Sequence, residues 1–293
     1  MSFEQWRLVY KNQQALINRL HACCAISTRV LAVLRLDSLP EKALKVFECL
    51  AVNEQLRSFT LIGGTALALQ ISHRKSEDLD FWLPAEKMDK ETISAAVRTA
   101  QQAGFVAQLV TPHDKIVAAK INGRDLLAYA QDYVIGGVKV TFFARVDTAF
   151  QHFNAYPRIA YSATSFGIMD LEGIFSMKSY VIHQRIRSRD LFDLKTFVQR
   201  GKTIEDILQA GSAADPACSS EYAKSVLLGD VPLDKEDEGF DSVDVTEKLE
   251  DIYAFFKCAV NEYEQTLAEQ TFDVMLCSRC REVKCVCDAK GLG

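Results

Sequence analysis

Two aspartates separated by one residue, Asp78 and Asp80, are the strongest chemical signal in the sequence. They stand at the start of an apolar run, residues 79–83, with the composition of a buried strand. Because alternate side chains of a strand share one face, the two carboxylates point the same way while Leu79 and Phe81 point into the core. Mg²⁺ prefers one or two carboxylates together with substrate phosphates. The pattern therefore predicts a divalent-cation site.

A glycine pair precedes these aspartates and follows an apolar run, residues 59–62, that we expect to be a buried strand. At Gly63 and Gly64 the backbone can take positive φ and approach a ligand closely. Thr65 is then expected to cap a short helix, whose first-turn amides and positive dipole end suit a phosphate. A glycine pair or an Asp-x-Asp alone is usually a turn or a solvated loop, but their order along the chain is specific. A phosphate cradle beside a metal site suits in-line attack on a nucleoside triphosphate.

A second polar group lies about a hundred residues downstream. Asp170 is expected to cap or open a helix in which Lys178 lies close to an apolar stripe. A lysine there either extends its ammonium out to water or reaches toward a triphosphate as a point charge. Asp190 and Asp193 come next, and their three-residue spacing puts them near one helix face, although Asp190 has the alternative of simply capping that helix. The turn before them is basic and contains His183, Arg185, Arg187 and Arg189.

Both stretches resemble motifs of one protein family. GGTALALQISHRKSEDLDF is similar to the first motif of the AbiEii-type nucleotidyltransferases, the toxins of bacterial toxin–antitoxin and phage-abortive systems. These proteins belong to the DNA polymerase β-like nucleotidyltransferase superfamily. The stretch from Asp170 through Lys178 to Arg189-Asp190-Leu-Phe-Asp193-Leu is similar to a second motif. The resemblance spans residues 59–198, and two separated motifs in the right order make it specific.

The resemblance implies an enzyme that moves a nucleoside monophosphate from a nucleoside triphosphate to a hydroxyl and releases pyrophosphate. It implies that Asp78 and Asp80 hold Mg²⁺ and act in catalysis with Lys178 and Asp193. In this reading Asp193 positions Lys178 or the incoming hydroxyl, and Arg74 and Lys178 neutralise the charge that develops in the transition state. The nucleotide-binding residues that we expect are Gly63, Gly64, Thr65, Arg74 and Ser76. The resemblance further suggests a tRNA 3′ end as acceptor, growth arrest as outcome and a cognate antitoxin as partner.

The sequence departs from the superfamily at one position. Members usually carry a third metal-binding carboxylate on the strand after the Asp-x-Asp hairpin, and here pattern alignment places Thr141 there. Threonine cannot supply an anionic ligand, and nothing in the sequence selects among three substitutes, Asp125, Asp132 and Asp147. A single-metal site or a weakened enzyme therefore stays open. Two other functions also stay open, namely nucleotide binding without transfer and nucleotidylation of a small molecule or a protein.

The end of the chain carries four closely spaced cysteines, Cys277, Cys280, Cys285 and Cys287. Four thiolates can bind Zn²⁺ tetrahedrally, and the first pair has the usual C-x-x-C spacing. The second pair is C-x-C and follows closely, which is tight for a zinc knuckle. The sequence leaves open both a structural zinc site and a reduced, flexible tail.

Composition narrows the class of protein. With 48% hydrophobic and 25% charged residues, the chain is typical of soluble globular proteins. It has no apolar run long enough to span a bilayer and no signal-peptide pattern, so we expect a cytoplasmic protein. The net charge of −5 is uneven, since residues 201–293 hold 9 basic and 20 acidic side chains while residues 1–75 hold 10 and 5. A basic catalytic part with an acidic tail is compatible with binding a polyanion.

We expect an α+β fold in which a mixed or antiparallel sheet forms the nucleotidyltransferase core, helices flank it and the C-terminal part is mostly helical. The predicted divisions are an N-terminal helical layer (1–57), the core (58–150), a helical region completing the active site (151–228), and an acidic linker, closing helix and cysteine-rich tail (229–293).

Periodicity predicts helices over residues 3–24, 28–36, 41–56, 88–103 and 245–270, the chain turning helical from residue 165. A four-stranded meander is predicted over residues 105–111, 115–121, 124–134 and 138–144, with turns at Asn122-Gly123 and Gly136-Gly137.

Overall fold

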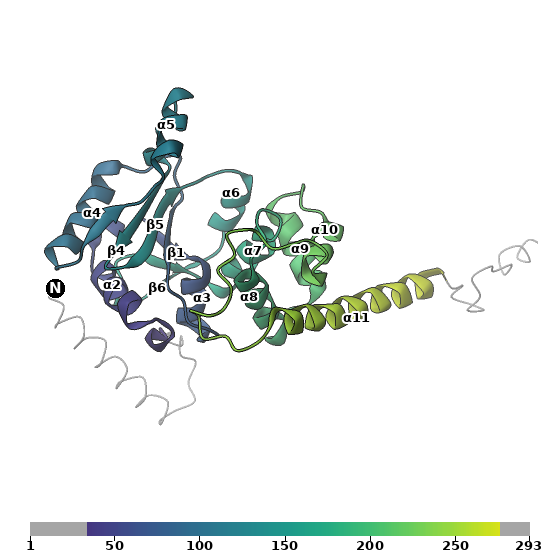
Figure 1. Cartoon of the computed structure of the whole chain (residues 1–293). Coiled ribbons are helices and arrows are strands. Elements are labelled where there is room, and N and C mark those ends of the chain that lie inside the picture. The colour runs from purple at the N-terminus through teal and green to yellow at the C-terminus, as the bar shows by residue number, and fades with distance from the viewer. Residues whose placement is uncertain (1–33, 276–293) are drawn as a thin grey trace, which may run out of the picture.

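The structure is a computed structural model that describes residues 34–275, with side chains described to residue 270. The helix predicted over residues 3–24, most of the one over 28–36 and the four tail cysteines lie outside the described residues. The α+β prediction is confirmed: helices surround a single mixed sheet (Figure 1).

Seven strands form the sheet, in the order β3-β4-β5-β2-β1-β7-β6. They are β1 (Thr60–Ile62), β2 (Leu79–Leu83), β3 (Ala107–Leu109), β4 (Ala130–Ile135), β5 (Val138–Ala144), β6 (Arg158–Ala160) and β7 (Gly167–Met169). β1 pairs antiparallel with β2 and parallel with β7, whereas β2 pairs parallel with β5. The two predicted motif strands, β1 and β2, therefore lie inside the sheet, where each is paired with a neighbouring strand on both sides.

The strand register fixes the positions of three polar side chains. Asp80 of β2 lies opposite Thr141 of β5, and Thr141 lies opposite Asp132 of β4. Directly opposed residues on neighbouring strands present their side chains on the same face of a sheet. These three side chains therefore form a row across the sheet.

Helices α2 (Glu41–Ala51) and α4 (Lys90–Gln102) contact each other and cover the sheet on one side (Figure 1). Pro40 is the N-cap of α2, and the helix ends five residues before the predicted end because Asn53 caps a separate 3₁₀ turn. Asp89 caps α4, and Gly104 follows it with φ of 92°. The apolar faces of both helices are buried, and this burial holds the layer on the sheet.

The second predicted strand of the meander is wrong. Residues 115–121 belong to helix α5 (His113–Ile121), which projects from the sheet (Figure 1). Pro112 stands at its N-cap and it contains good helix formers such as Ala118 and Ala119, while none of its residues is buried. β3 therefore pairs directly with β4, and the glycine turn predicted between β4 and β5 is present.

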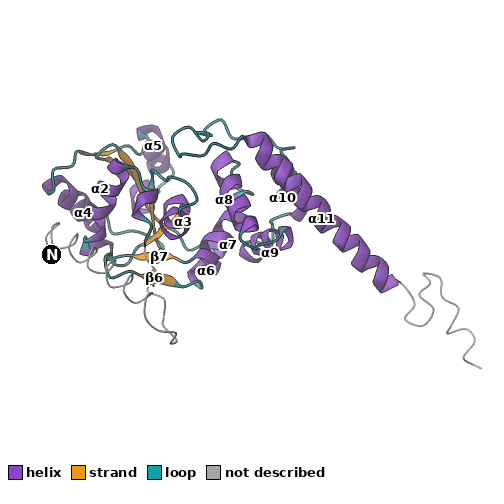
Figure 2. Ribbon diagram, turned by 90° about the horizontal axis from the view of Figure 1, so that it is seen from below, coloured by secondary structure: helices purple, strands orange, loops and turns teal. Residues whose placement is uncertain are grey.

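The C-terminal half is helical only from residue 171, because β6 and β7 precede the first long helix and correct the start predicted at residue 165. The helices are α6 (Thr148–Asn154), α7 (Leu171–Val181), α8 (Ser188–Gln199), α9 (Ile204–Ala214), α10 (Ser220–Leu228) and α11 (Leu249–Met275). Asp170 caps α7 by accepting a hydrogen bond from the Gly173 amide. α7 packs against α3 (Gly63–Ile71), α8 and α9, so it joins the helical part to the sheet (Figure 2).

The acidic segment between α10 and α11 folds back onto the start of α8. Asp234 accepts a hydrogen bond from the Ile186 amide at 3.2 Å, and Asp237 accepts one from the Ser188 amide at 2.9 Å. The predicted loop is thus tied to the basic turn that precedes Asp190, although much of it is exposed.

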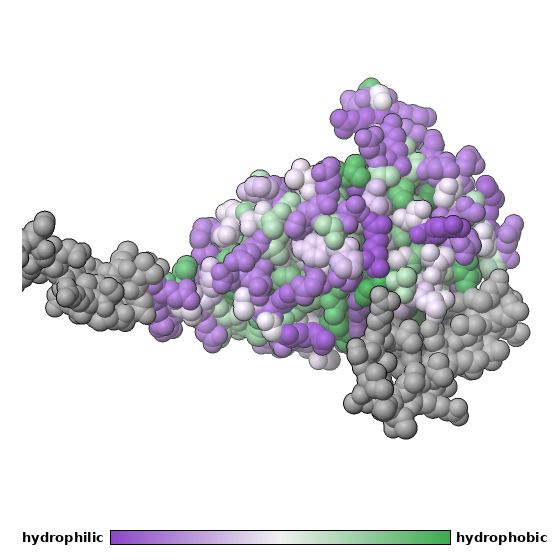
Figure 3. Space-filling view, turned by 180° about the vertical axis from the view of Figure 1, so that it is seen from behind, coloured by the Kyte–Doolittle hydropathy of each residue, from purple (hydrophilic) through white to green (hydrophobic). Residues whose placement is uncertain are grey.

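Hydrophilic side chains cover most of the face shown in Figure 3, with apolar patches that are small and scattered. Within residues 34–275, no helix has the length and apolar character needed to cross a membrane.

Candidate active site

The glycine pair begins helix α3 (Gly63–Ile71) directly after β1, and both glycines are required there. Gly63 has φ of 76°, and a Cβ on it would lie 3.0 Å from Asp80 Oδ2. A Cβ on Gly64 would lie 2.4 Å from a terminal nitrogen of Arg74, closer than real Cβ contacts come. The absence of side chains therefore lets a carboxylate and a guanidinium approach the first turn of α3.

Thr65 does not cap α3, which corrects the prediction. The N-cap lies three residues earlier, at Ile62, because positive φ at Gly63 turns the chain immediately after the strand. The Thr65 hydroxyl instead donates to the carbonyl of Asp78 and lies 2.7 Å from the Ser76 hydroxyl. Thr65 and Ser76 thereby fix the loop that carries Asp78.

The two predicted metal ligands share an electrostatically unfavourable site. Burial, with the neighbouring charge of Asp80, raises the pKa of Asp78 to about 6. Burial also raises the pKa of Asp80, against the opposing effects of Arg185 and Lys139. Carboxylates whose ionised forms are penalised by burial and mutual repulsion are stabilised by a divalent cation. The donor chemistry of this pair therefore fits Mg²⁺.

No group of three or more acidic, histidine or cysteine side chains in the described part of the chain is arranged to hold a metal ion. One or two carboxylates with substrate phosphates and water are the usual ligand set of Mg²⁺.

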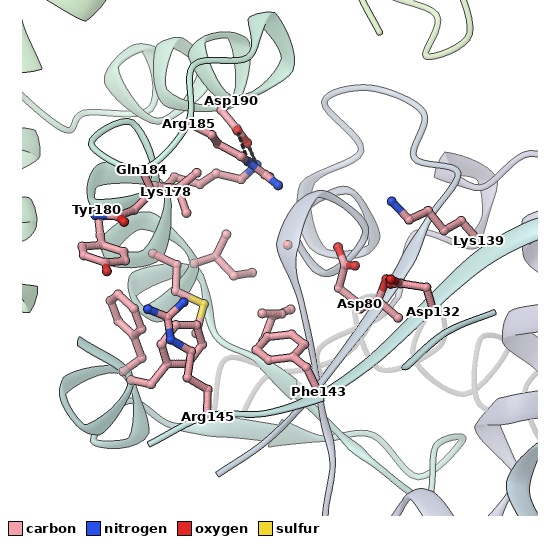
Figure 4. Close-up of a pocket in the computed structure, with 18 residues that line it drawn as sticks. Asp80, Asp132, Lys139, Phe143, Arg145, Lys178, Tyr180, Gln184, Arg185 and Asp190 are labelled. Carbon is pink, nitrogen blue, oxygen red and sulfur yellow. Dashed lines mark hydrogen bonds and ion pairs between the residues drawn. The ribbon is translucent and has the colours of Figure 1, made fainter. Parts of the chain in front are cut away.

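The structure distinguishes among the three substitutes for the third carboxylate. Thr141 occupies the expected register position beside Asp80, and its hydroxyl donates to Asp132 Oδ1 at 2.9 Å. Asp132 and Asp80 line the same cavity and lie next to each other in Figure 4. Asp125 instead pairs with Lys90 at 2.6 Å, and Asp147 caps α6. Of the three, Asp132 is the one that shares a cavity with Asp80.

Lys178 is buried, with 5% of its surface exposed, so its ammonium does not extend to water. Its Nζ lies 2.5 Å from Asp190 Oδ1 and 2.6 Å from Asp193 Oδ2. Asp190 is the third residue of α8 and not its cap, which is Arg187. Both aspartates of the predicted motif thus bind the predicted lysine.

Asp193 is fully buried and accepts bonds from three bases. His73 Nε2 and Arg74 Nε each lie 2.7 Å from its Oδ1, and Lys178 binds Oδ2. Burial alone would raise its pKa, but the charges of Arg74 and Lys178 hold the pKa of Asp193 well below its usual range. The sequence pattern did not predict a role for His73, and its only signal was its place beside Arg74.

Two cavities meet at this cluster. The first, the glycine pocket, is lined by residues of the first turn of α3, the loop before β2 and the basic turn: Gly64, Thr65, Arg74, Ser76, Asp78, Arg187 and Arg189 among others. The second, the aromatic pocket, has a volume of about 430 Å³ and lies between β5, α6 and α7. The two pockets share four lining residues, which are Asp80, Lys178, Arg185 and Asp190.

The arginines of the basic turn differ in their partners. Arg185 pairs with Asp190 at 3.1 Å, and Arg189 pairs with Glu238 of the acidic segment at 2.9 Å. Arg187, by contrast, has a buried Nε without a hydrogen-bond partner among the described residues. An unpaired buried donor beside a polar pocket is suited to binding an anion. Arg187 was recognised in the sequence as part of the basic turn, but no role was predicted for it.

Comparisons with known proteins identify the family of the chain. The family described as nucleotidyl transferase AbiEii toxin, type IV toxin–antitoxin system, matches residues 46–273. Among solved structures, JHP933 from Helicobacter pylori is 19% identical, with a TM-score of 0.44 and coverage of 80% of this chain and 97% of that one. The nucleotidyltransferase toxin MenT4 from Mycobacterium tuberculosis is 13% identical, with a TM-score of 0.40 and coverage of 74% and 86%. No curated protein matches the chain in sequence.

Proposed function

Because the chain belongs to the AbiEii family of nucleotidyltransferase toxins, we propose that it transfers a nucleoside monophosphate from a nucleoside triphosphate to a hydroxyl with Mg²⁺ as cofactor. The observation that carries this proposal is the approach of Asp80 to the glycine start of α3, beside a pocket lined by four arginines. Carboxylates for a cation, helix amides for phosphates and cationic side chains are the parts that phosphoryl transfer needs.

In this proposal Asp78 and Asp80 hold Mg²⁺, which supplies charge neutralisation at the reacting phosphate. The β- and γ-phosphates lie in the glycine pocket, against the first-turn amides of α3 and the hydroxyl of Ser76. Arg187 contributes its free donor to the same phosphates. The role that we propose for Arg74 differs from the one expected from the sequence, which was direct charge neutralisation in the transition state. Its guanidinium donates two hydrogen bonds to Asp193 and so holds that carboxylate in place.

Lys178 lies where the two pockets meet, so its ammonium faces the place where the α-phosphate would sit. Asp190 and Asp193 fix this ammonium from behind. A cation that is held in place before the reaction stabilises charge developing on the phosphate without reorganisation. Asp193 is therefore a positioning residue in this proposal, since it is fully buried and cannot meet the acceptor hydroxyl.

In the transfer step the acceptor oxygen forms a bond to the α-phosphorus while the bond from that phosphorus to the bridging oxygen breaks. Pyrophosphate leaves, and the hydroxyl proton passes to a base. Asp132 is the carboxylate that we assign to the third position of the superfamily, beside Asp80 and held by Thr141. It lies on the far side of Asp80 from the glycine pocket, where an acceptor would approach.

The acceptor that we propose is the 3′ end of a tRNA, with growth arrest as the outcome and a cognate antitoxin as partner. This part rests on the resemblance and on the description of the family as a toxin of a type IV toxin–antitoxin system.

The test is incubation of the purified protein with each α-labelled nucleoside triphosphate, Mg²⁺ and total tRNA. We expect label in the RNA, none when EDTA is present, and none with Asp80→Asn. Label in a protein or in a small molecule, with none in the RNA, would mean that this molecule and not tRNA is the acceptor. Nucleotide binding without any labelled product would contradict transfer.

A further inference from the structure

Helix α8 begins differently from its neighbours in the helical half of the chain. In α6, α7, α9 and α10 the N-cap residue uses its own side chain to accept a hydrogen bond from an amide of the first turn. The N-cap of α8 is Arg187, whose side chain makes no such bond. A guanidinium has donors and no acceptor, so arginine is not among the residues that suit an N-cap. The presence of an arginine at this position therefore needs another explanation.

The cap of α8 comes from the acidic segment, residues 229–248, which lies between α10 and α11. Asp237 Oδ1 accepts hydrogen bonds from the amide and the hydroxyl of Ser188, both at 2.9 Å. Ser188 is the first residue of α8, and only 2% of its surface is exposed. Asp237 thus satisfies a first-turn donor that Arg187 cannot satisfy, and its charge complements the positive end of the helix dipole.

The acidic segment is anchored on both sides of Asp237. Before it, Asp234 donates its amide to the Ile186 carbonyl at 2.9 Å and accepts the Ile186 amide on its carboxylate at 3.2 Å. After it, Val243 is fully buried, and its carbonyl accepts the Lys75 amide at 2.9 Å. Asp237 therefore meets α8 from a segment that is itself tied to the basic turn and to the loop before β2.

This contact bears directly on the glycine pocket. The Ser188 amide that Asp237 holds belongs to the peptide unit that follows the Arg187 α-carbon, so it fixes the backbone from which the Arg187 side chain departs. Arg187 lines the glycine pocket, and its buried Nε has no hydrogen-bond partner among the described residues. With the cap supplied by Asp237, the guanidinium of Arg187 is left for the pocket.

We propose that Asp237 is a positioning residue of the active site, which caps α8 in place of Arg187 and so fixes the Arg187 donor where the β- and γ-phosphates bind. This inference rests on the proposed nucleotidyl transfer, and it adds to the phosphate site a residue that lies outside both sequence motifs.

The charge of Asp237 acts in the opposite direction, which makes the proposal testable by the sign of one effect. Asp237 also lines the glycine pocket, and a carboxylate there disfavours phosphates. If Asp237 acted only as a charge, its removal would tighten phosphate binding. As a positioning residue it has the reverse effect, because its oxygen is bonded to the start of α8 and its charge is partly balanced by the helix dipole.

The test measures the affinity of inorganic tripolyphosphate, with Mg²⁺ present, by titration calorimetry. Asp237→Ala removes both the charge and the cap. Asp237→Asn removes the charge alone, since the amide oxygen of asparagine can still accept from Ser188. Asp241→Ala is the matched control, because it removes an exposed carboxylate of the same segment from outside the lining of the glycine pocket. A melting curve checks that each variant is folded at the assay temperature.

We expect Asp237→Ala to bind tripolyphosphate about tenfold more weakly than wild type, the lower end of the effect of one hydrogen bond to a charged group. Asp237→Asn should bind at least as tightly as wild type, and Asp241→Ala should resemble wild type. Equal or tighter binding by folded Asp237→Ala would overturn the inference. A loss in Asp237→Asn as large as that in Asp237→Ala would overturn it too, since the cap would then not be what matters.

A double-mutant cycle with Arg187→Gln separates positioning of one side chain from a general loosening of α8. If Asp237 acts through Arg187, Asp237→Ala should cause no further loss of affinity in the Arg187→Gln background. Two losses that multiply would contradict this route and overturn the inference, while leaving nucleotidyl transfer standing. Failure of the wild-type chain to bind tripolyphosphate at all would overturn both the inference and the proposed phosphate site.

Discussion

The ammonium of Lys178 lies 2.6 Å from Asp193 Oδ2, and both side chains are buried. The contact joins α7 to α8, and through Arg74 and His73 it reaches the loop between the glycine turn and β2. The two sequence motifs, far apart along the chain, therefore meet in one buried ionic cluster. In the proposed mechanism, any change at Lys178 would therefore act on both the reacting phosphate and the fold.

Lys178→Met separates these two effects. Removing the charge at the junction of the pockets should lower the transfer rate by about a hundredfold or more. The free energy of unfolding should fall by about 1–3 kcal/mol, which is less than the cost of removing one partner of an isolated buried ion pair. The reason is that Asp190 still pairs with Arg185, and Asp193 still pairs with Arg74 and His73. The rate is measured at saturating Mg²⁺ and nucleotide, well below the melting temperature. A folded variant with wild-type rate would remove Lys178 from the proposed mechanism.

Asp80→Asn should remove transfer and weaken metal binding, since a neutral amide replaces an anionic ligand. The metal-free protein should become more stable, because burial penalises the Asp80 charge and raises its pKa. Binding of Mn²⁺ in place of Mg²⁺ can be followed by titration calorimetry, independently of any activity. Equal Mn²⁺ affinity in wild type and variant would contradict the proposed metal site.

Asp78 predicts a pH dependence in the metal-free protein. Its folded pKa of about 6 lies above the ordinary value of 3.8, so between these values the folded state binds more protons than the unfolded state. The free energy of unfolding should therefore fall as pH rises from about 4 to 6 and remain lower above that window.

Asp78→Asn removes this contribution and should stabilise the metal-free protein at pH 7 by about 1–2 kcal/mol, a value reduced for the partial exposure of the side chain. The measurement is urea unfolding in EDTA at several pH values. The difference between variant and wild type is the readout, because Asp190 and Asp193 have lowered pKa values and contribute with the opposite sign. A difference that does not change between pH 4 and 7 would refute the prediction.

The centre of the fold was predictable because its signals are local. The strand, glycine pair, helix and Asp-x-Asp strand follow one another within 25 residues, and the structure reproduces them. The error at residues 115–121 arose because a short apolar segment fits a strand or a helix equally well until its neighbours are known. β6 and β7, with three residues each, are too short to give a periodic pattern.

The relations within the site were less predictable, since they depend on tertiary contacts. Nothing in the sequence places Asp132 beside Asp80, because that proximity comes from the pairing of β4, β5 and β2. The partners of Lys178 were suggested by the second motif, but its burial was not. Thr65 was wrongly predicted as the N-cap of α3, because positive φ at Gly63 lets the helix start three residues earlier, after Ile62.

Asp132→Asn tests the assignment of the third carboxylate. The asparagine keeps the size of the side chain and can still accept a hydrogen bond from Thr141, so the fold should be preserved. Loss of the charge beside Asp80 should lower the transfer rate by about a hundredfold or more, the size of effect expected for a general base or one electrostatic contact. Asp125→Asn is the matched control, because that carboxylate forms an exposed pair with Lys90 and should change neither rate nor stability by much. Thr141→Val, which frees Asp132 from its donor, should give a smaller decrease than Asp132→Asn. If Asp132→Asn transfers as fast as Asp125→Asn, Asp132 has no role in transfer, and Asp78 and Asp80 act without a third carboxylate.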